Sequence, residues 1–381
     1  MHVVRHGFAG GGMENGVINV ANGLPPERFR ISVCALDSAQ TFSQRIRAAD
    51  AEYHLLPKQG RGVHWGLVWR LARLLRQTKV DLVHSHNWAT FLYAVLAAKL
   101  AGLPIIHGEH GKNPGELNET NRPKQWAKSV LGRRVDRLVT VSQAIQNEWV
   151  GYGVPAGRIQ WIPNGVDVDR FRPRTDRQEQ RRRFGLPEGG FVLGSIGRMD
   201  VLKNYEVLVD AFAQFAGDFP DWHLALLGDG PCALRLRRRV AELGLADRVY
   251  LPGRQPDPEN FLAALDLFVL PSKTEGMSNV VLEAMASGLP VACNDLPCHH
   301  EILEPGQEGV LVAPCTAETL ADAVSALCRD PERRRSLGLA ARNKAVSRFN
   351  MARMVSDYER LYAEYAPAET QGAETRAAVR S

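Results

Sequence analysis

The segment EGMSNVVLEAMASGLPVA (residues 275–292) combines two carboxylates with the predicted start of a helix. Glu275 precedes that helix, and Glu283 lies about one and a half turns inside it. Ser278 is suited to the N-cap position. The first backbone N–H groups would then be left unpaired at the positive end of the helix, where a diphosphate can bind. These N–H groups belong to Asn279, Val280 and Val281.

Both glutamates suit a sugar nucleotide better than a bare phosphate. A carboxylate at Glu283, beside a bound anion, accepts two hydrogen bonds from a ribose diol, as in dinucleotide sites. Glu275, at the mouth, is placed to accept hydrogen bonds from sugar hydroxyls. An ordinary capped helix with two surface glutamates explains the same sequence, so the assignment of a binding site here depends on other segments of the chain.

Two cations follow an earlier predicted strand, in SIGRMDVLKN (195–204). Arg198 and Lys203 flank the loop after that strand, where they would neutralise a departing diphosphate. Two solvated loop charges remain the alternative. No metal site is expected: Asp167 and Asp169 lie in a turn and alone do not make a cage, and the doublet His299-His300 lacks a third ligand.

The N-terminal half offers weaker signals. Gly11 and Gly12 follow the first predicted strand, where glycine lets the backbone approach a ligand, although a tight turn explains them equally well. Their spacing does not give the dinucleotide-binding fingerprint GxGxxG, which argues against a dehydrogenase. His110, in IHGEHGKN (106–113), follows another predicted strand and can face a cleft, but single histidines are often structural.

Strand-like apolar runs alternate with helical stretches along most of the 381 residues, which predicts an α/β fold with parallel sheets covered on both faces. The pattern pauses near IPNG (162–165) and restarts. We therefore expect two Rossmann-like doubly wound domains facing across a cleft, with ligand at the carboxyl ends of the strands. The predicted parts are domains at 1–165 and 166–349, a helix at 350–366 that packs back on the first domain, and a disordered tail at 367–381.

Composition and charge indicate where the protein is located and what kind of partner it binds. No uncharged apolar stretch reaches the length of a membrane span, and the N-terminus has no signal pattern, which predicts a cytoplasmic protein. The six scattered cysteines predict reduced thiols rather than a disulfide framework. Residues 1–165 carry 20 Lys and Arg against 11 Asp and Glu, a net +9, whereas the remainder is −4. A basic first half favours an anionic partner; we expect no nucleic acid.

A basic amphipathic helix is the candidate for that contact. In the predicted helix from Trp65 to Gln77, apolar residues alternate with arginines, as in helices that lie on anionic lipid. An ordinary helix covering the first sheet is the alternative. The residues involved are Trp65, Leu67, Val68, Leu71, Leu74, Leu75, Arg70, Arg73 and Arg76, with Arg122, Lys124, Lys128, Arg133 and Arg134 assigned to the same basic patch.

The motifs taken together resemble the retaining glycosyltransferases of family 4, which have the GT-B fold. The resemblance covers about residues 1–365 and is carried by segments in the family order. These are GGMEN (11–15), EHG (109–111), VSQAI (141–145), IPNGVD (162–167), GRMDVLKN (197–204), LLGDGP (226–231), RVYLPG (248–253), LPSKTEGMSNVVLEAMASGLPV (270–291) and EGVLV (308–312).

This resemblance implies a role for each matching residue. Gly11 and Gly12 lie near the donor phosphates, His110 positions the donor sugar, and Arg198 with Lys203 binds the diphosphate. Glu275 contacts sugar hydroxyls, Glu283 holds the ribose, and the backbone beside them completes the site. That backbone belongs to Gly276, Asn279, Val280 and Val281. The family implies no cofactor beyond a UDP- or GDP-linked sugar, no metal, and a leaving phosphate that itself takes the acceptor proton.

The opening residues further resemble sugar transferases of bacterial exopolysaccharide clusters. That implies a hexose-type donor sugar, a glycan or polyprenyl-diphosphate-linked acceptor, and a position on the inner face of the cytoplasmic membrane. Two other functions remain open on the same fold: a sugar-nucleotide epimerase, which needs no acceptor, and a non-catalytic scaffold subunit. The complete set of charged residues argues against the scaffold.

Overall fold

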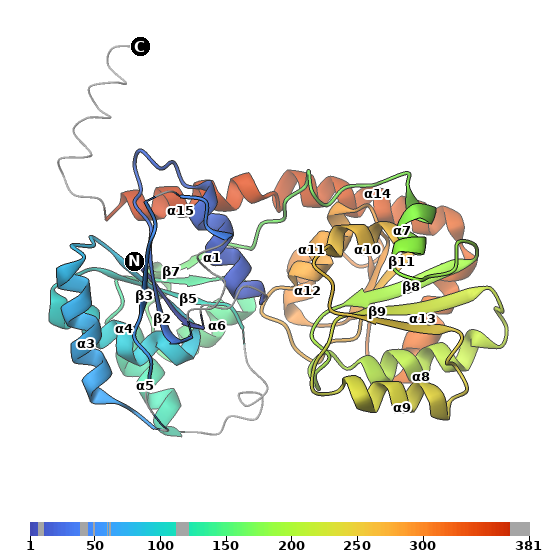
Figure 1. Cartoon of the computed structure of the whole chain (residues 1–381), viewed down its shortest axis with the longest axis horizontal. Coiled ribbons are helices and arrows are strands. Elements are labelled where there is room, and N and C mark those ends of the chain that lie inside the picture. Colours follow the sequence, from blue (N-terminus) through green and yellow to red (C-terminus); the bar gives the residue numbers. More distant parts are fainter. Residues whose placement is uncertain are drawn as a thin grey trace, which may run out of the picture. The chain divides into compact units, whose positions relative to one another are not determined.

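The computed structural model describes the chain except for residues 7–10, 39–44, 49, 59, 61, 112–121 and 366–381. Its described residues divide into two compact units (Figure 1). The first comprises residues 1–111, 122–164 and 352–365, and the second comprises residues 165–351. The predicted tail at 367–381 lies outside the described residues.

The first unit is built on a seven-stranded parallel sheet with the order β3-β2-β1-β4-β5-β6-β7. The order reverses direction between β1 and β4. Its strands are β1 (His2–His6), β2 (Ser32–Ser38), β3 (Glu52–Leu55), β4 (Val83–His86), β5 (Ile105–Glu109), β6 (Arg137–Thr140) and β7 (Ile159–Trp161). Its helices are α1 (Gly12–Gly23), α3 (Trp65–Gln77), α4 (Asn87–Ala101), α5 (Arg122–Gly132), α6 (Gln143–Gly151), the short 3₁₀ helix η2 (Ala156–Arg158) and α15 (Met351–Ala363).

The second unit repeats the architecture with six parallel strands in the order β10-β9-β8-β11-β12-β13. These are β8 (Phe191–Ile196), β9 (Trp222–Leu227), β10 (Val249–Gly253), β11 (Leu267–Leu270), β12 (Val291–Asn294) and β13 (Val310–Val312). The helices are α7 (Arg177–Arg183), α8 (Tyr205–Ala216), α9 (Ala233–Glu242), α10 (Pro258–Ala264), α11 (Asn279–Ala286), α12 (Pro297–Ile302), α13 (Ala317–Arg329) and α14 (Pro331–Arg348). Here the order reverses between β8 and β11.

Strand composition explains both sheets. A parallel strand covered by helices on both faces needs a nearly continuous run of buried residues. All four residues of β11 and all five of β5 are buried. In the second unit α8 and α9 lie on one face of the sheet, and α10 and α11 lie on the other (Figure 1). The prediction of two doubly wound α/β domains is therefore confirmed.

The C-terminal helix α15 belongs to the first unit although the second unit precedes it in the chain. It buries Met354, Tyr358, Leu361 and Tyr362, and the Tyr362 hydroxyl lies 2.6 Å from Nδ1 of His84 on β4. All six cysteines are free thiols, as predicted. Among the described residues, no helix is both long enough and apolar enough to cross a bilayer.

Candidate functional site

The loops after β8 and β11 meet at the switch point of the second sheet. Open α/β sheets bind ligands beside the carboxyl ends of their strands at such points. The backbone N–H of Lys273 donates to the Leu202 carbonyl at 2.8 Å, which ties the two loops together. Nζ of Lys203 donates to Oε1 of Glu275 at 2.6 Å. Two residues predicted independently, 72 positions apart, are thus in direct contact.

The environment keeps Lys203 charged. Burial lowers the pKa of its ammonium, but the Glu275 carboxylate, Tyr205 and Asp200 raise it by more, so the pKa lies above its usual value. The side chains of Lys203 and Glu275 are both mostly buried. Charge-assisted hydrogen bonds in such surroundings hold their geometry without reorganisation. The pair is therefore a fixed cation and acceptor at the edge of the sheet.

Helix α11 begins directly after this loop, with Ser278 at the N-cap as predicted. The expected cap bond is absent, because the buried Ser278 hydroxyl makes no hydrogen bond to the first turn. Val281 is fully buried, so only its backbone can contribute to a site. The N-terminal end of α11 thus follows Glu275 and Gly276 and is not satisfied by its own cap side chain.

Glu283 lies in the middle of α11 and is partly buried. Burial raises the pKa of its carboxyl from 4.5 to about 7. Arg170 and Lys203 lower this pKa and Glu259 raises it, but burial prevails. A carboxyl with a pKa near neutrality is more typical of a binding site than of a surface charge.

Arg198 differs from Lys203. Its side chain is 70% exposed, and Nε lies 3.8 Å from Oδ2 of Asp200 on the same loop. Asp200 instead organises the loop itself, accepting from the backbone N–H groups of Leu202 and Lys203. The structure therefore shows Lys203 fixed in place and Arg198 reaching into solvent from the same loop.

Two glycines let the loop after β9 run against the loop after β8. Gly228 has a φ of +141°, and a Cβ there would lie 2.0 Å from the Gly197 carbonyl oxygen. A Cβ on Gly230 would lie 2.5 Å from the Met199 carbonyl oxygen. Backbone approach this close requires glycine at both positions. It also fixes the path of the segment that carries Arg198 and Lys203.

Replacing Gly228 with alanine is expected to lower the free energy of unfolding by about 2 kcal/mol or more, because strain and overpacking add at one residue. Urea unfolding measures the loss. Gly217→Ala is the matched control, since a Cβ there meets nothing within 4 Å. Equal midpoints for the two variants would show that the close approach does not constrain the loops.

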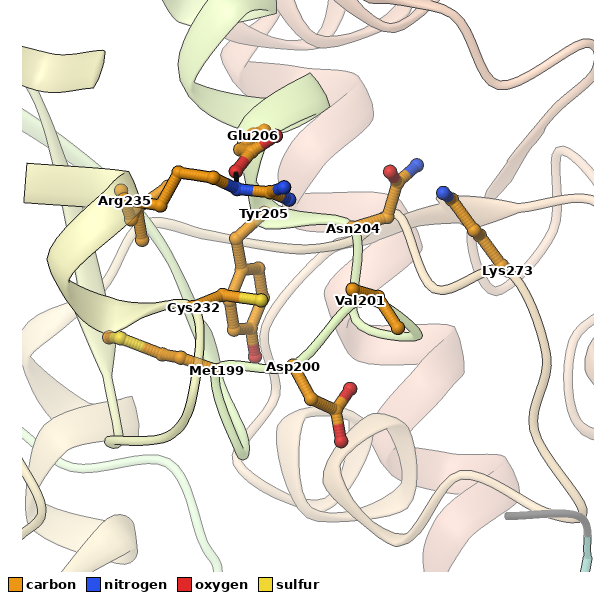
Figure 2. Close-up of a pocket in the computed structure, with 10 residues that line it drawn as sticks. Met199, Asp200, Val201, Asn204, Tyr205, Glu206, Cys232, Arg235 and Lys273 are labelled. Atoms are coloured by element: carbon orange, nitrogen blue, oxygen red, sulfur yellow. Dashed lines mark ion pairs between the residues drawn. The ribbon is translucent and has the colours of Figure 1, made fainter. Parts of the chain in front are cut away.

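A hollow of about 70 Å³ opens beside the same loop, in the second unit (Figure 2). An ion pair joins Arg235 to Glu206 among its lining residues. The hollow is smaller than sites for drug-sized ligands, which run to about 300 Å³ or more. Its lining includes neither Lys203 nor Glu275. It is therefore a neighbour of the Lys203–Glu275 pair and does not contain it.

In the first unit, the candidate residues follow β1 and β5. Gly11 is the extended N-cap of α1, and Gly12 is its first residue. A Cβ on Gly11 would lie 2.2 Å from Oε2 of Glu14, so the loop packs closely on its own helix. Gly10, the first glycine of the run, lies outside the described residues.

His110 is one of several packed imidazoles. Its Nε2 lies 3.0 Å from Nδ1 of His86, and its backbone N–H donates to Oδ1 of Asn87 at 2.9 Å. Burial lowers the pKa of His110 to about 4, so its ring is neutral at pH 7. Sequence reasoning missed His86 and His84; the signal was VHSH, two histidines two positions apart on one strand, which face the same side of a sheet.

Two features discounted in the sequence have structural explanations. Oδ1 of Asp167 accepts from the backbone N–H groups of Asp169 and Arg170, so this carboxylate closes a turn. His299 is buried with Nδ1 2.7 Å from the Asn294 carbonyl oxygen, whereas His300 pairs with Asp295.

The predicted basic patch needs correction. Lys124 and Lys128 are buried, and their ammonium groups stack over aromatic rings: Lys124 over Trp88 at 4.9 Å, and Lys128 over Trp149 at 5.4 Å. They therefore add no surface charge. In α3 the residues Leu67, Val68, Leu71 and Leu75 are core, so this face of the helix covers the sheet, as the alternative stated.

Comparison with known proteins identifies the family to which the chain belongs. Residues 10–170 match the family model described as Glycosyltransferase Family 4, and residues 176–344 match the model of Glycosyl transferases group 1. A D-inositol 3-phosphate glycosyltransferase of Corynebacterium jeikeium is 30% identical over 312 residues, covering 77% of this chain and 74% of the relative. The chain belongs to glycosyltransferase family 4.

Other relatives agree with this membership. An Escherichia coli UDP-Gal:alpha-D-GlcNAc-diphosphoundecaprenol alpha-1,3-galactosyltransferase is 28% identical over 305 residues, 77% of each chain. Anabaena HepE, solved with UDP and glucose, superposes with a TM-score of 0.83 at 22% identity over 96% of this chain and all of its own. That superposition shows the GT-B fold of this family 4 glycosyltransferase.

Proposed function

We propose that this glycosyltransferase moves a hexose-type sugar from a nucleotide-diphosphate sugar to a glycan or polyprenyl-diphosphate-linked acceptor, as a step in cell-surface polysaccharide synthesis. The observation that carries the proposal is the Lys203–Glu275 pair at the switch point of the second sheet. The Escherichia coli relative bears the name of an enzyme that uses UDP-galactose and a lipid-diphosphate-linked acceptor, and HepE was solved with UDP. We favour a UDP-linked donor for that reason.

The roles follow from the chemistry of each group. Lys203, joined by Arg198 from the same loop, neutralises the charge that develops on the leaving diphosphate. The first-turn N–H groups of α11 add a positive helix end, and Glu283 accepts from the ribose diol. Glu275 keeps Lys203 aligned and accepts from sugar hydroxyls, while His110 positions the sugar. The transferred sugar keeps its anomeric configuration, and the leaving phosphate takes the acceptor proton.

Metal independence is part of the proposal. The cation that a metal would supply elsewhere is the Lys203 ammonium, whose pKa is raised by Glu275 and which is therefore charged at all working pH values. Transfer should accordingly continue in a chelating buffer with no loss of kcat.

A thermal-shift panel of UDP- and GDP-sugars tests the donor. A ligand at 100 times its Kd stabilises the folded protein by about 2.7 kcal/mol, so the true donor class should raise Tm clearly above the other. No shift with any sugar nucleotide would contradict the proposal. A shift combined with donor conversion in the absence of an acceptor would identify the epimerase instead, and binding without turnover would identify a scaffold subunit.

The exposed side of α3 supports a membrane-contacting role for the first unit. Trp65 and Trp69 are 62% and 63% exposed, and the arginines at 70, 73 and 76 are also exposed. A hollow of about 320 Å³ beside the helix start is lined by Trp65, Lys58 and Arg70 among others. Exposed tryptophans flanked by cations suit the headgroup region of an anionic bilayer. We propose that this surface brings the enzyme to a lipid-linked acceptor.

Flotation with liposomes containing anionic lipid tests this surface. The intact protein should float at low salt and be released as salt rises, because juxtamembrane cations contribute about 1 kcal/mol each. The double variant Trp65→Ala, Trp69→Ala should float markedly less, whereas Trp126→Ala, which removes an equally exposed tryptophan from α5, should not. Absence of flotation by the intact protein at low salt would reject the proposal.

A further inference from the structure

The hollow beside the start of α3 lies at the carboxyl edge of the first sheet. It measures about 320 Å³, and its walls are the segment after β3 and the first turns of α3. Parallel strands end at one common edge of a sheet, so this hollow and His110, which follows β5, lie at the same edge. Ligand sites begin at about 300 Å³, so the hollow can hold a small-molecule group.

Backbone hydrogen bonds to neighbouring elements hold both walls. The N–H of Lys58 donates to the Leu36 carbonyl of β2 at 2.8 Å. The N–H of His64 donates to the Tyr93 hydroxyl of α4 at 3.3 Å. The Leu67 N–H donates to the His64 carbonyl at 3.0 Å, which closes the first turn of α3. The walls are therefore held by β2 and α4, and they do not need a ligand to form.

The charged side chains that line this hollow are cations. Lys58 and Arg70 are both exposed, and no Asp or Glu is among the described lining residues. Nη1 of Arg70 lies 3.5 Å from the Pro57 carbonyl oxygen, so the guanidinium reaches from α3 to the opposite wall. The sequence from 53 to 80 holds six Lys and Arg and no Asp or Glu. An ammonium and a guanidinium with no carboxylate beside them suit phosphate oxygens.

Apolar side chains surround the two cations. Val63 and Trp65 line the hollow and are exposed, whereas Leu67 lines it from the core side. Tyr53 and Leu55 of β3, the strand that leads into one wall, are exposed as well. Exposed apolar surface beside polar groups marks contact with a ligand or a membrane. A free inorganic anion would leave this surface in water, whereas a phosphate carried on a lipid would cover it.

We propose that this hollow binds the diphosphate head of an isoprenoid lipid, with Lys58 and Arg70 on the phosphate oxygens and Val63 and Trp65 against the first carbons of the chain. The inference rests on the proposed function for the identity of the lipid, and it adds the place where the head of that lipid is held. A diphosphate bound here keeps the attached glycan at the sheet edge where His110 lies.

Calorimetric titration of the full chain with farnesyl diphosphate, a soluble isoprenoid diphosphate, tests the site. No sugar nucleotide is present, so the result does not depend on transfer activity. We expect binding that is retained in Lys203→Ala, the variant that removes the cation of the candidate donor site. Inorganic pyrophosphate and dihexanoyl-phosphatidylglycerol should each bind at least about 10-fold more weakly, because the first lacks the chain and the second lacks one phosphate.

Residue 66 offers a change of charge that the fold tolerates. A Cβ on Gly66 meets nothing within 4 Å, and glycine inside a helix is destabilising, so Gly66→Glu and Gly66→Gln should both fold. Gly66→Glu places a carboxylate in the lining of the hollow and should weaken the binding of farnesyl diphosphate at least about 10-fold. Gly66→Gln has the same size without the charge and should keep most of the affinity.

Substitution of the two cations tests the contacts directly. Lys58→Gln and Arg70→Gln should each weaken the binding of farnesyl diphosphate about 10–100-fold, the loss of a hydrogen bond to a charged group. Arg73→Gln removes an exposed arginine of α3 that does not line the hollow, and should leave the affinity unchanged.

Three results would overturn the proposal. One is the absence of farnesyl diphosphate binding by the intact chain. Another is equal affinity in Gly66→Glu and Gly66→Gln, or loss of binding in Lys203→Ala, either of which would place the diphosphate elsewhere. The third is equal affinity for inorganic pyrophosphate or for the phospholipid, which would identify a site for free anions or for phospholipid head groups. Intact binding in a protein that transfers no sugar would count against the proposed function alone.

Discussion

Lys203→Ala is expected to lower kcat for sugar transfer about 10²–10³-fold, the loss measured when one fixed donor to a developing anion is removed. The Lys203 ammonium is the cation that the structure holds at the switch point, at 2.6 Å from Glu275. Its charge matters most once the diphosphate begins to leave, so kcat should fall more than donor affinity. Steady-state kinetics with varied donor measure both quantities.

Lys273→Ala is the matched control. Lys273 is an exposed residue in the loop after β11, and among the contacts described it binds Leu202 only through its backbone N–H, which the substitution keeps. This variant should keep near-normal kcat. Glu275→Ala should also lose transfer, since it leaves Lys203 unaligned and removes an acceptor for sugar hydroxyls. Full activity in either Lys203→Ala or Glu275→Ala would show that the pair is structural.

Affinity for a nucleotide sugar is expected to rise about 10-fold between pH 6 and pH 8. Burial raises the pKa of Glu283 to about 7, so the carboxylate that accepts from the ribose diol is a minor form at pH 6 and the major form at pH 8. Apparent affinity scales with the fraction in the competent form. A ribose diol favours the charged form, so binding releases a proton in this range.

Glu283→Gln should bind the donor about 10–100-fold more weakly, the loss of a hydrogen bond to a charged group, and its affinity should not change between pH 6 and pH 8. The raised pKa of Glu283 also affects the free energy of unfolding in the absence of ligand. The stabilisation that the buried, protonated carboxyl contributes is fully present below the pKa of the unfolded chain, 4.5, and is lost as the pH rises through the folded pKa of about 7. The free energy of unfolding of Glu283→Gln should not show this fall. A pH-independent affinity in the intact protein would contradict the ribose role.

The fold was predictable because it depends on local patterns. Buried runs such as LFVL in β11 and the glycines that end strands specify parallel strands in series. Short or half-exposed elements were missed: β7 has three residues with one exposed, and α12 begins at a proline and has six residues. The strand order itself, which creates the switch point, required the structure.

The sequence marked candidate site residues one by one but did not show which of them are in contact. Residue types marked Lys203 and Glu275, yet nothing in the sequence showed that they form an ion pair. The charge pattern wrongly predicted that Lys124 and Lys128 lie in a basic surface patch, because aromatic rings of residues distant in sequence cover them. The histidine cluster was missed for a similar reason: His2, His84 and His110 are far apart in sequence, and only the pairing of β1, β4 and β5 brings them together.

A crystal structure of the protein with UDP-hexose bound tests the central claim most directly. We predict that diphosphate oxygens lie within hydrogen-bonding distance of Lys203 Nζ and the first-turn N–H groups of α11, with the ribose diol on Glu283. A nucleotide bound elsewhere, with Lys203 still joined only to Glu275 and no phosphate at the start of α11, would contradict the account.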